Sequence, residues 1–267
     1  MRIASPGHAV FAASTIVLGL LGFMNRDYAA FGHPISNFVP AHPLLGYFCA
    51  VYLMACGAGL LWRRTAITAA RALFAYLLLW SLLVSLPDII RVHASFGAWY
   101  NLAEPAVLLA AAWVLYAWFA PDWDRRHLRF VTGVQGVRAA QVLFGLTMIY
   151  FGLGHFVFLK VTVADVPQWL PWPDLWAYFT GSTFIAAGGA IVIRVWAPLA
   201  AALSAVQIGL FFLLVWFPAI VRTGPISPFH WGETISTAAL MVGAWVIADS
   251  YRVMLPLTSN ADSRHNL

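Results

Sequence analysis

Histidine and carboxylate side chains gather at the ends of several apolar segments, where groups that exchange protons are most readily placed. His155 closes one such segment, and His230 and Glu233 open another. In a medium of low dielectric constant, a carboxylate raises the pKa of a neighbouring imidazole while burial lowers it. A His155–Glu233 pair could therefore hold or pass a proton near neutral pH. We predict these two as catalytic residues; the alternative is a buried polar pair that only joins two helices.

An aromatic stretch follows the segment that His155 closes. Residues 166–176 contain three prolines and three tryptophans. Prolines fix the course of a surface loop, and tryptophans favour the interface between membrane and water. Flat side chains can instead line a site for a planar amphipathic molecule, such as a quinone head group. On that interpretation, the predicted ligand-binding residues are Trp169, Trp172, Trp231, His230 and Tyr178.

Other chemistry has little support in the sequence. It contains no phosphate-binding loop, GxSxG elbow, CxxC or HExxH motif. Cys49 and Cys56 are seven positions apart in one apolar segment. In a helix their Cα atoms lie about 10 Å apart, too far for a disulfide. We predict neither a thiol-redox pair nor a metal site.

The composition indicates which elements must position these residues. The chain has 267 residues, of which 62% are hydrophobic and 9% charged, and its mean hydropathy is +0.80. A water-soluble domain is about 25% charged, so the excess apolar surface here must face the lipid bilayer. The apolar runs are about twice as long as the strands of a membrane β-barrel. An all-α polytopic membrane protein is predicted.

Eight transmembrane helices are expected from the apolar runs. We place them at 8–24, 43–62, 66–90, 100–119, 137–158, 174–193, 195–220 and 232–250. The first is interpreted as a span rather than a cleaved signal, because no small-x-small site follows it.

The basic residues predict the orientation. Of the 15 lysines and arginines, 11 fall on the side of the termini and 4 on the other. By the positive-inside rule both termini are cytoplasmic, in a bacterial inner membrane. The net charge of +5 is thus explained by topology, and no nucleic-acid partner is expected.

The two halves of the chain resemble each other. An offset of 131 residues aligns Tyr47-Phe48 with Tyr178-Phe179, Gly57 with Gly188, Arg63 with Arg194, Pro87 with Pro218 and Arg91 with Arg222. Slightly different offsets align Val39-Pro40 with Val166-Pro167, Trp99 with Trp231 and Trp113 with Trp245. Because each half has an even number of spans, the repeats enter the membrane from the same side. Two parallel four-helix bundles are predicted, with Pro87 and Pro218 kinking equivalent helices.

The predicted division is a first repeat at 1–119, a cytoplasmic linker at 120–136, a second repeat at 137–252 and a polar tail at 253–267. Asn101 is the counterpart of Glu233, and the region expected to match His155, Met24 to Tyr28, has no histidine. The second repeat is therefore predicted to carry the site, and the first to be a degenerate copy.

The second repeat resembles the DoxX-like membrane proteins over about 147–215. The similarity lies in Gly154-His155-Phe156 at the end of a span, Val166-Pro167 with Pro171, Tyr178-Phe179-Thr180-Gly181 and Gly188-Gly189. The resemblance implies a four-helix bundle and an oxidoreductase-associated function, since that family includes subunits of thiosulfate:quinone oxidoreductase.

Three functions follow from these observations. The first is a membrane redox component that binds a quinone-like or other apolar ligand at the outer end of the second bundle and works with a membrane or periplasmic redox partner. The second is a non-catalytic membrane assembly partner that docks through the aromatic loop. The third is a cofactor-free isomerase or cyclase in which His155 and Glu233 act as acid and base on a lipid.

Overall fold

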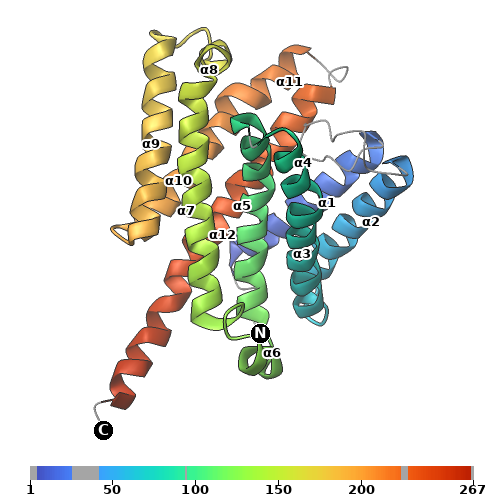
Figure 1. Ribbon diagram of the computed structural model, residues 1–267, viewed down its shortest axis with the longest axis vertical. Coiled ribbons are helices and arrows are strands. Elements are labelled where there is room, and N and C mark those ends of the chain that lie inside the picture. The colour runs from blue at the N-terminus through green and yellow to red at the C-terminus, as the bar shows by residue number, and fades with distance from the viewer. Residues whose placement is uncertain (1–4, 26–41, 94, 224–227, 266–267) are drawn as a thin grey trace.

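The structure is a bundle of long helices (Figure 1). It is a computed structural model that describes residues 5–25, 42–93, 95–223 and 228–265. The Val39-Pro40 match lies outside these residues. The helices of the first half are α1 (Pro6–Asn25), α2 (His42–Leu61), α3 (Ala66–Trp80), the π-helical η1 (Ser81–Ser85), α4 (Leu86–Arg91) and α5 (Phe96–Phe119). Then follow α6 (Asp122–His127), α7 (Gly133–Val157), α8 (Leu159–Asp165), α9 (Pro173–Ile193), α10 (Ala197–Phe211), the π-helical η2 (Phe212–Trp216), α11 (Phe217–Thr223) and α12 (Pro228–His265).

Among the described residues, eight helical stretches are long and apolar enough to cross a membrane, which confirms the predicted all-α polytopic membrane fold. Their bounds lie within a few residues of those expected. The fourth begins at Phe96 rather than 100, because the Ser95 hydroxyl accepts a hydrogen bond from the backbone N–H of Ala98 and caps the helix there. The fifth begins at Gly133 rather than 137. The segment predicted as a polar tail continues α12 to His265.

The spans place the connections at two ends of the molecule. In Figure 1, α8 and α11 lie at one end, here the α8 end, while α6, the start of α1 and the end of α12 lie at the other, here the α6 end. His155 closes α7 at the α8 end, and Glu233 lies in the first turns of α12 at the same end. The fold thus brings the predicted site residues to one end of the bundle.

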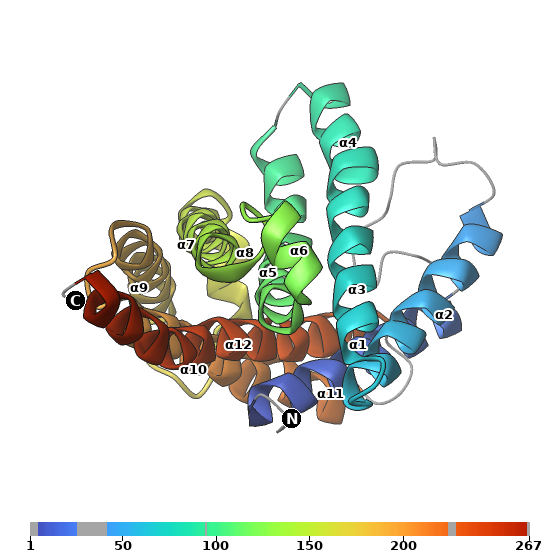
Figure 2. The same ribbon diagram turned by 90° about the horizontal axis from the view of Figure 1, so that it is seen from below.

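Helices α5 and α12 pack against each other at the centre of the molecule (Figure 2). In α5, 78% of the span is buried inside the protein, against 22% in the span that begins with α3. Ala110, Ala111 and Ala112 of α5 are completely buried. Since lipid tails are as apolar as leucine, membrane helices associate mainly through close packing, which small side chains permit.

The element order of the first half recurs in the second. Helices α3 and α10, and the π-helical segments η1 and η2, begin and end at residues related by the same offset of 131. The backbone N–H of Leu86 reaches back to Ser81, and that of Phe217 reaches back to Phe212. The feature that precedes Pro87 and Pro218 is thus a wide π-helical turn. We refer to α1 to α5 as the first repeat and α7 to α12 as the second.

Equivalent glycines bring the first two spans of each repeat into backbone contact. A Cβ added at Gly19 would lie 2.6 Å from the backbone oxygen of Ala50 and 2.9 Å from the backbone nitrogen of Met54. At Gly152 it would lie 2.5 Å from the oxygen of Gly181 and 2.9 Å from the nitrogen of Ile185. The partners are again 131 positions apart, and the glycines 133. Helices α1 and α7 therefore align with an offset of 133.

Gly188 provides a test of this contact, because its neighbour Gly189 is a matched control. A Cβ at Gly188 would overlap the backbone oxygen of Gly145, whereas none of the described atoms lies within 4 Å of a Cβ at Gly189. We expect Gly188→Ala to lower the free energy of unfolding by about 1–3 kcal/mol. Gly189→Ala should leave it unchanged or raise it, because alanine favours the helix. Thermal unfolding in detergent measures both; equal melting temperatures would contradict the close contact.

The fourth span of each repeat also contacts the first span of the other repeat. Helix α5 packs against α7, and α12 packs against α1, while α5 and α12 keep contact with α3 and α10 of their own repeats. The two predicted four-helix units therefore share a common wall formed by α5 and α12. Residues from both repeats lie together along this wall.

The connection predicted as a polar linker is folded. Asp124 of α6 is buried, and its carboxylate accepts hydrogen bonds from the guanidinium of Arg71 and, at 2.8 Å, from the hydroxyl of Tyr116. The indole Nε1 of Trp113 donates to the backbone oxygen of Val131 at 2.7 Å. These bonds tie α6 and the residues after it to α3 and α5, so that the join between the repeats has a fixed position.

We expect Asp124→Ala to lower the free energy of unfolding by about 2 kcal/mol, because it leaves Tyr116 and Arg71 without their shared acceptor. Asp122→Ala is the control, since Asp122 is an exposed acidic residue of the same short helix. Thermal unfolding of both variants in the same detergent measures the difference. If the control loses as much stability as Asp124→Ala, the effect does not come from the hydrogen bonds of Asp124 with Arg71 and Tyr116.

Candidate functional site

His155 is held near the end of α7 by one hydrogen bond and two aromatic rings. Its Nδ1 lies 2.9 Å from the backbone oxygen of Phe151. Because a carbonyl oxygen only accepts, Nδ1 carries the proton and Nε2 of the neutral ring is the acceptor. The ring packs edge-on against Phe184 of α9 and stacks on Phe211 of α10, with centroid distances of 5.5 and 5.9 Å. The side chain is partly buried.

His155 and three phenylalanine rings, from three helices, form a continuous cluster. Phe184 lies 5.8 Å from Phe211 and 6.3 Å from Phe151, measured between ring centroids. We call Phe151, His155, Phe184 and Phe211 the aromatic cluster. Rings at these distances and tilts attract one another beyond the effect of area burial. The cluster therefore fixes the orientation of the imidazole.

Tyr100 of α5 packs beside the end of α7, the helix that carries His155. Tyr100 packs edge-on against Phe151 at 5.6 Å, and a Cβ added at Gly154 would overlap its ring. Glu104, Glu233 and Asp165 lie within electrostatic range of the Tyr100 hydroxyl. Tyr100, a residue of the first repeat, therefore lies close to carboxylates of the second.

The predicted His155–Glu233 pairing stays a prediction. Within the described part of the chain, the hydrogen bond that His155 makes is the one to Phe151. The backbone oxygen of Glu233 accepts a hydrogen bond from the Ser236 hydroxyl at 3.3 Å. The contacts described above connect the two residues indirectly, from the aromatic cluster through Phe151 to Tyr100.

Asp165 and His230 bring a second pair of titratable groups within electrostatic range of each other at this end. Asp165 is the last residue of α8, and His230 lies in the first turn of α12. Partial loss of hydration raises the pKa of the Asp165 carboxyl, and the charge of His230 opposes that rise. The two interacting groups place the end of α8 near the start of α12.

The tryptophans of the predicted ligand wall point outward. Trp169 and Trp172 are 67% and 73% exposed, and Trp231 is also exposed. Tyr178 is exposed as well and stacks on Phe156 at 5.9 Å. Trp172 has a φ of 52° immediately before Pro173, which turns the chain into α9. Their exposure favours the interfacial role of these side chains; their role as a ligand wall stays a prediction.

The repeat alignment corrects the expected counterpart of His155. The offset of 133 shown by the glycine contacts matches His155 with Gly22, not with a residue between Met24 and Tyr28. Its neighbour on α9 changes too. A Cβ at Gly181 would lie 2.9 Å from the Cβ of His155, whereas the residue equivalent to Gly181 in the first repeat is Ala50. The first repeat thus has a smaller residue than the second on its first span, Gly22 in place of His155, and a larger one on its second span, Ala50 in place of Gly181.

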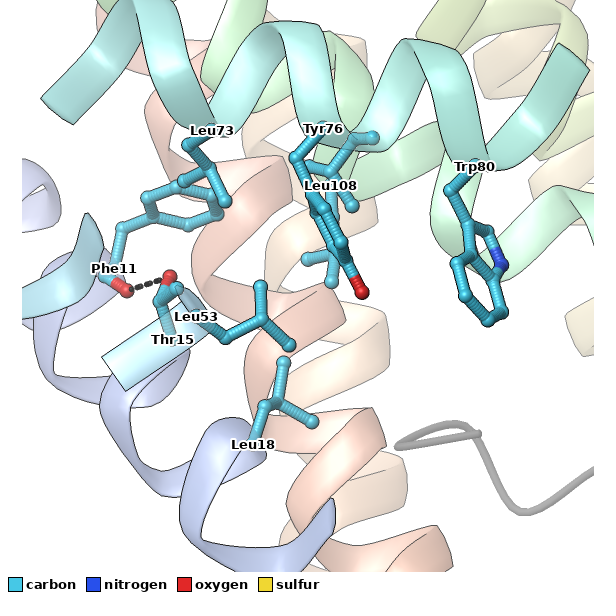
Figure 3. A pocket seen from close by; sticks show the side chains of 9 residues that line it. Phe11, Thr15, Leu18, Leu53, Leu73, Tyr76, Trp80 and Leu108 are labelled. Carbon is cyan, nitrogen blue, oxygen red and sulfur yellow. Dashed lines mark hydrogen bonds between the residues drawn. The ribbon is translucent and has the colours of Figure 1, made fainter. Parts of the chain in front are cut away.

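A cavity lies in the first repeat, the half that was predicted to be a degenerate copy. Its walls come from α1, α2, α3 and α5, and include Leu18, Leu53, Tyr76 and Trp80 (Figure 3). Cys49 and Cys56 of α2 are buried and free. Among the described residues, no group of three histidine, cysteine, aspartate or glutamate side chains could hold a metal ion.

Three residues of the candidate site, Tyr100, Phe184 and Phe211, were not predicted as site residues. Tyr100 was treated only as part of a span, and Phe184 and Phe211 have the ordinary composition of a membrane helix. Tyr100 is the counterpart of Gly232 at the offset that matches Trp99 with Trp231, so the repeat comparison marks it as a difference between the copies. No comparable sequence signal marks Phe184 and Phe211.

Comparison with known proteins gives no match: no protein-family model, no curated protein and no solved structure is similar to this chain.

The exchange between His155 and Gly181 can be tested with a double-mutant cycle. Gly181→Ala should destabilise the protein, because the new methyl group meets the Cβ of His155. Combining it with His155→Gly recreates the Gly22 and Ala50 pair of the first repeat. We expect a favourable coupling of about 1 kcal/mol between the substitutions. Unfolding free energies of the four proteins give this value, and strict additivity would contradict the contact.

Proposed function

We propose that this protein is a DoxX-like integral membrane protein that binds a quinone-like or other apolar ligand at the α8 end of the second repeat. The observation that carries the proposal is the position of His155. The aromatic cluster orients its ring, and its Nε2 is a hydrogen-bond acceptor. The neighbouring Tyr100 lies within electrostatic range of Glu233. A preoriented base beside apolar walls suits an amphipathic molecule with a polar head.

On this proposal, His155 and Glu233 exchange protons with the head group. Reduction of a quinone to a quinol takes up two electrons and two protons. The electrons come from a separate membrane or periplasmic redox partner, and the side chains of this chain deliver the protons. Tyr100, Trp231 and His230 lie near Glu233 along α5 and α12 and would orient the head group.

The exposure of the aromatic loop supports a second candidate, a non-catalytic membrane assembly partner. Trp169 and Trp172 lie in the connection between α8 and α9, with most of their surface uncovered. Exposed indoles at a membrane interface can anchor the chain or contact another membrane protein. This candidate needs no ligand in the second repeat.

One measurement on protein purified in lipid nanodiscs distinguishes the two candidate functions. Solvent extracts of the wild type should contain a small molecule that binds in proportion to the protein. Glu233→Gln and His155→Ala should fold but retain about ten- to hundredfold less of it, because each removes one of the two partly buried groups that can exchange a proton with the head group. Asn101→Ala, at the first-repeat counterpart of Glu233, is the control and should retain it. A wild type without a bound molecule, or variants that bind as well as it does, would favour the assembly partner.

We infer from the arginine and lysine distribution that the α6 end is cytoplasmic. Arg125 lies in α6, and His265 ends α12. Reporter fusions at both positions should therefore give a cytoplasmic signal in a bacterial host. An external signal at either position would overturn the orientation.

A further inference from the structure

We propose that the cavity of the first repeat is a binding site for a small, flat, apolar ring that enters from the membrane. The cavity is lined by nine side chains of α1, α2, α3 and α5, near the middle of these spans. It lies in the other repeat from the aromatic cluster, so the proposal is independent of the function proposed above.

The walls exclude water as the natural occupant. Three wall residues, Thr15, Tyr76 and Trp80, carry polar atoms. The Thr15 hydroxyl already donates to the backbone oxygen of Phe11 at 2.8 Å (Figure 3). The Tyr76 hydroxyl is hydrogen-bonded with the Cys49 thiol. Leu18, Leu53 and Leu73 supply aliphatic surface. A buried water needs two to four polar partners, about three on average. An apolar void that lacks them stays dry and favours an apolar guest.

The second repeat shows what fills the equivalent space. With the offsets fixed by the glycine contacts, Leu18 corresponds to Phe151, Leu53 to Phe184 and Trp80 to Phe211. These three phenylalanines belong to the aromatic cluster.

The fourth ring of the aromatic cluster, His155, corresponds to Gly22. The first repeat therefore lacks three of the four rings and retains one, Trp80. A ring-shaped guest would restore the packing that the side chains of the second repeat provide.

The remaining wall has the geometry for such a guest. Tyr76 and Trp80 stand on one face of α3, with ring centroids 6.1 Å apart, and the two rings border the open space in Figure 3. Flat rings stack on or meet the edges of such side chains at separations of about 4.5–7 Å. A flexible alkyl chain would lose more conformational freedom on binding here than a rigid ring.

Trp80 also marks the path of entry. It is the last residue of α3 before the π-helical η1, and its side chain is only partly buried. Leu79 and Leu83 beside it are exposed, which in this fold means that they face lipid. The cavity itself is about the size of one water molecule, so a ring can enter only if the walls move apart. Outward rotation of Trp80 makes room for the ring.

The test uses para-fluorotoluene as the probe and fluorine NMR of the full chain in nanodiscs. The wild type should show a saturable bound resonance, separate from that of probe dissolved in lipid. The double variant Leu18→Phe with Leu53→Phe introduces the residues of the second repeat and should lose the resonance. Leu20→Phe with Leu79→Phe is the matched control, since both leucines are exposed on α1 and α3. The control should keep it.

Two further measurements complete the test. If the double variant does not fold, as judged by helical circular dichroism, the single Leu53→Phe is scored in the same way. Unlabelled toluene should displace the probe, and heptane, with the same number of carbons, should not. The absence of a bound resonance in the wild type, its persistence in the filled variant, or equal displacement by heptane would each overturn the proposal.

Discussion

The backbone contact between the first two spans of each repeat is the constraint on which the other positions depend. In lipid, helices gain no hydrophobic free energy by meeting, so their spacing is set by how closely they can pack. Gly152 and Gly188 remove the side chains that would hold α7 and α9 apart, and thereby fix their register. With that register, Phe184 faces His155. The same arrangement in the first repeat places Leu53 of α2 opposite Leu18 of α1, where both line the cavity.

The sequence predicted the spans well, and the helix bounds recur at the offset of 131 found in the sequence, because both depend on features that a linear chain displays. Long apolar runs locate helices, and Pro87 with Pro218 or Gly57 with Gly188 keep their spacing. It could not predict that α5 contacts α7 and α12 contacts α1, because apolar helices carry no label for their partners. For the same reason His155 was identified as a candidate while its neighbour Phe211, on a different span, was not.

The two repeats differ in side-chain size at facing positions: where one helix has a larger residue, the helix opposite has a smaller one. Where the second repeat has His155 against Gly181, the first has Gly22 and Ala50. Rings fill the space between α7, α9 and α10, whereas a cavity remains between α1, α2 and α3. Because α5 and α12 contact both halves, neither repeat has a complete set of neighbours alone. The duplication has therefore produced one cooperative structure with two different interiors.

The π-helical segments change the direction in which the later part of each third span faces. Each wide turn accommodates one residue more than an α-helix would, and so rotates everything that follows by about 100° relative to what precedes it. Both repeats contain this shift at equivalent positions, η1 and η2. The part of the third span that follows the turn therefore presents a different set of side chains to its neighbours than an uninterrupted helix would, and it does so at matching residues of both repeats.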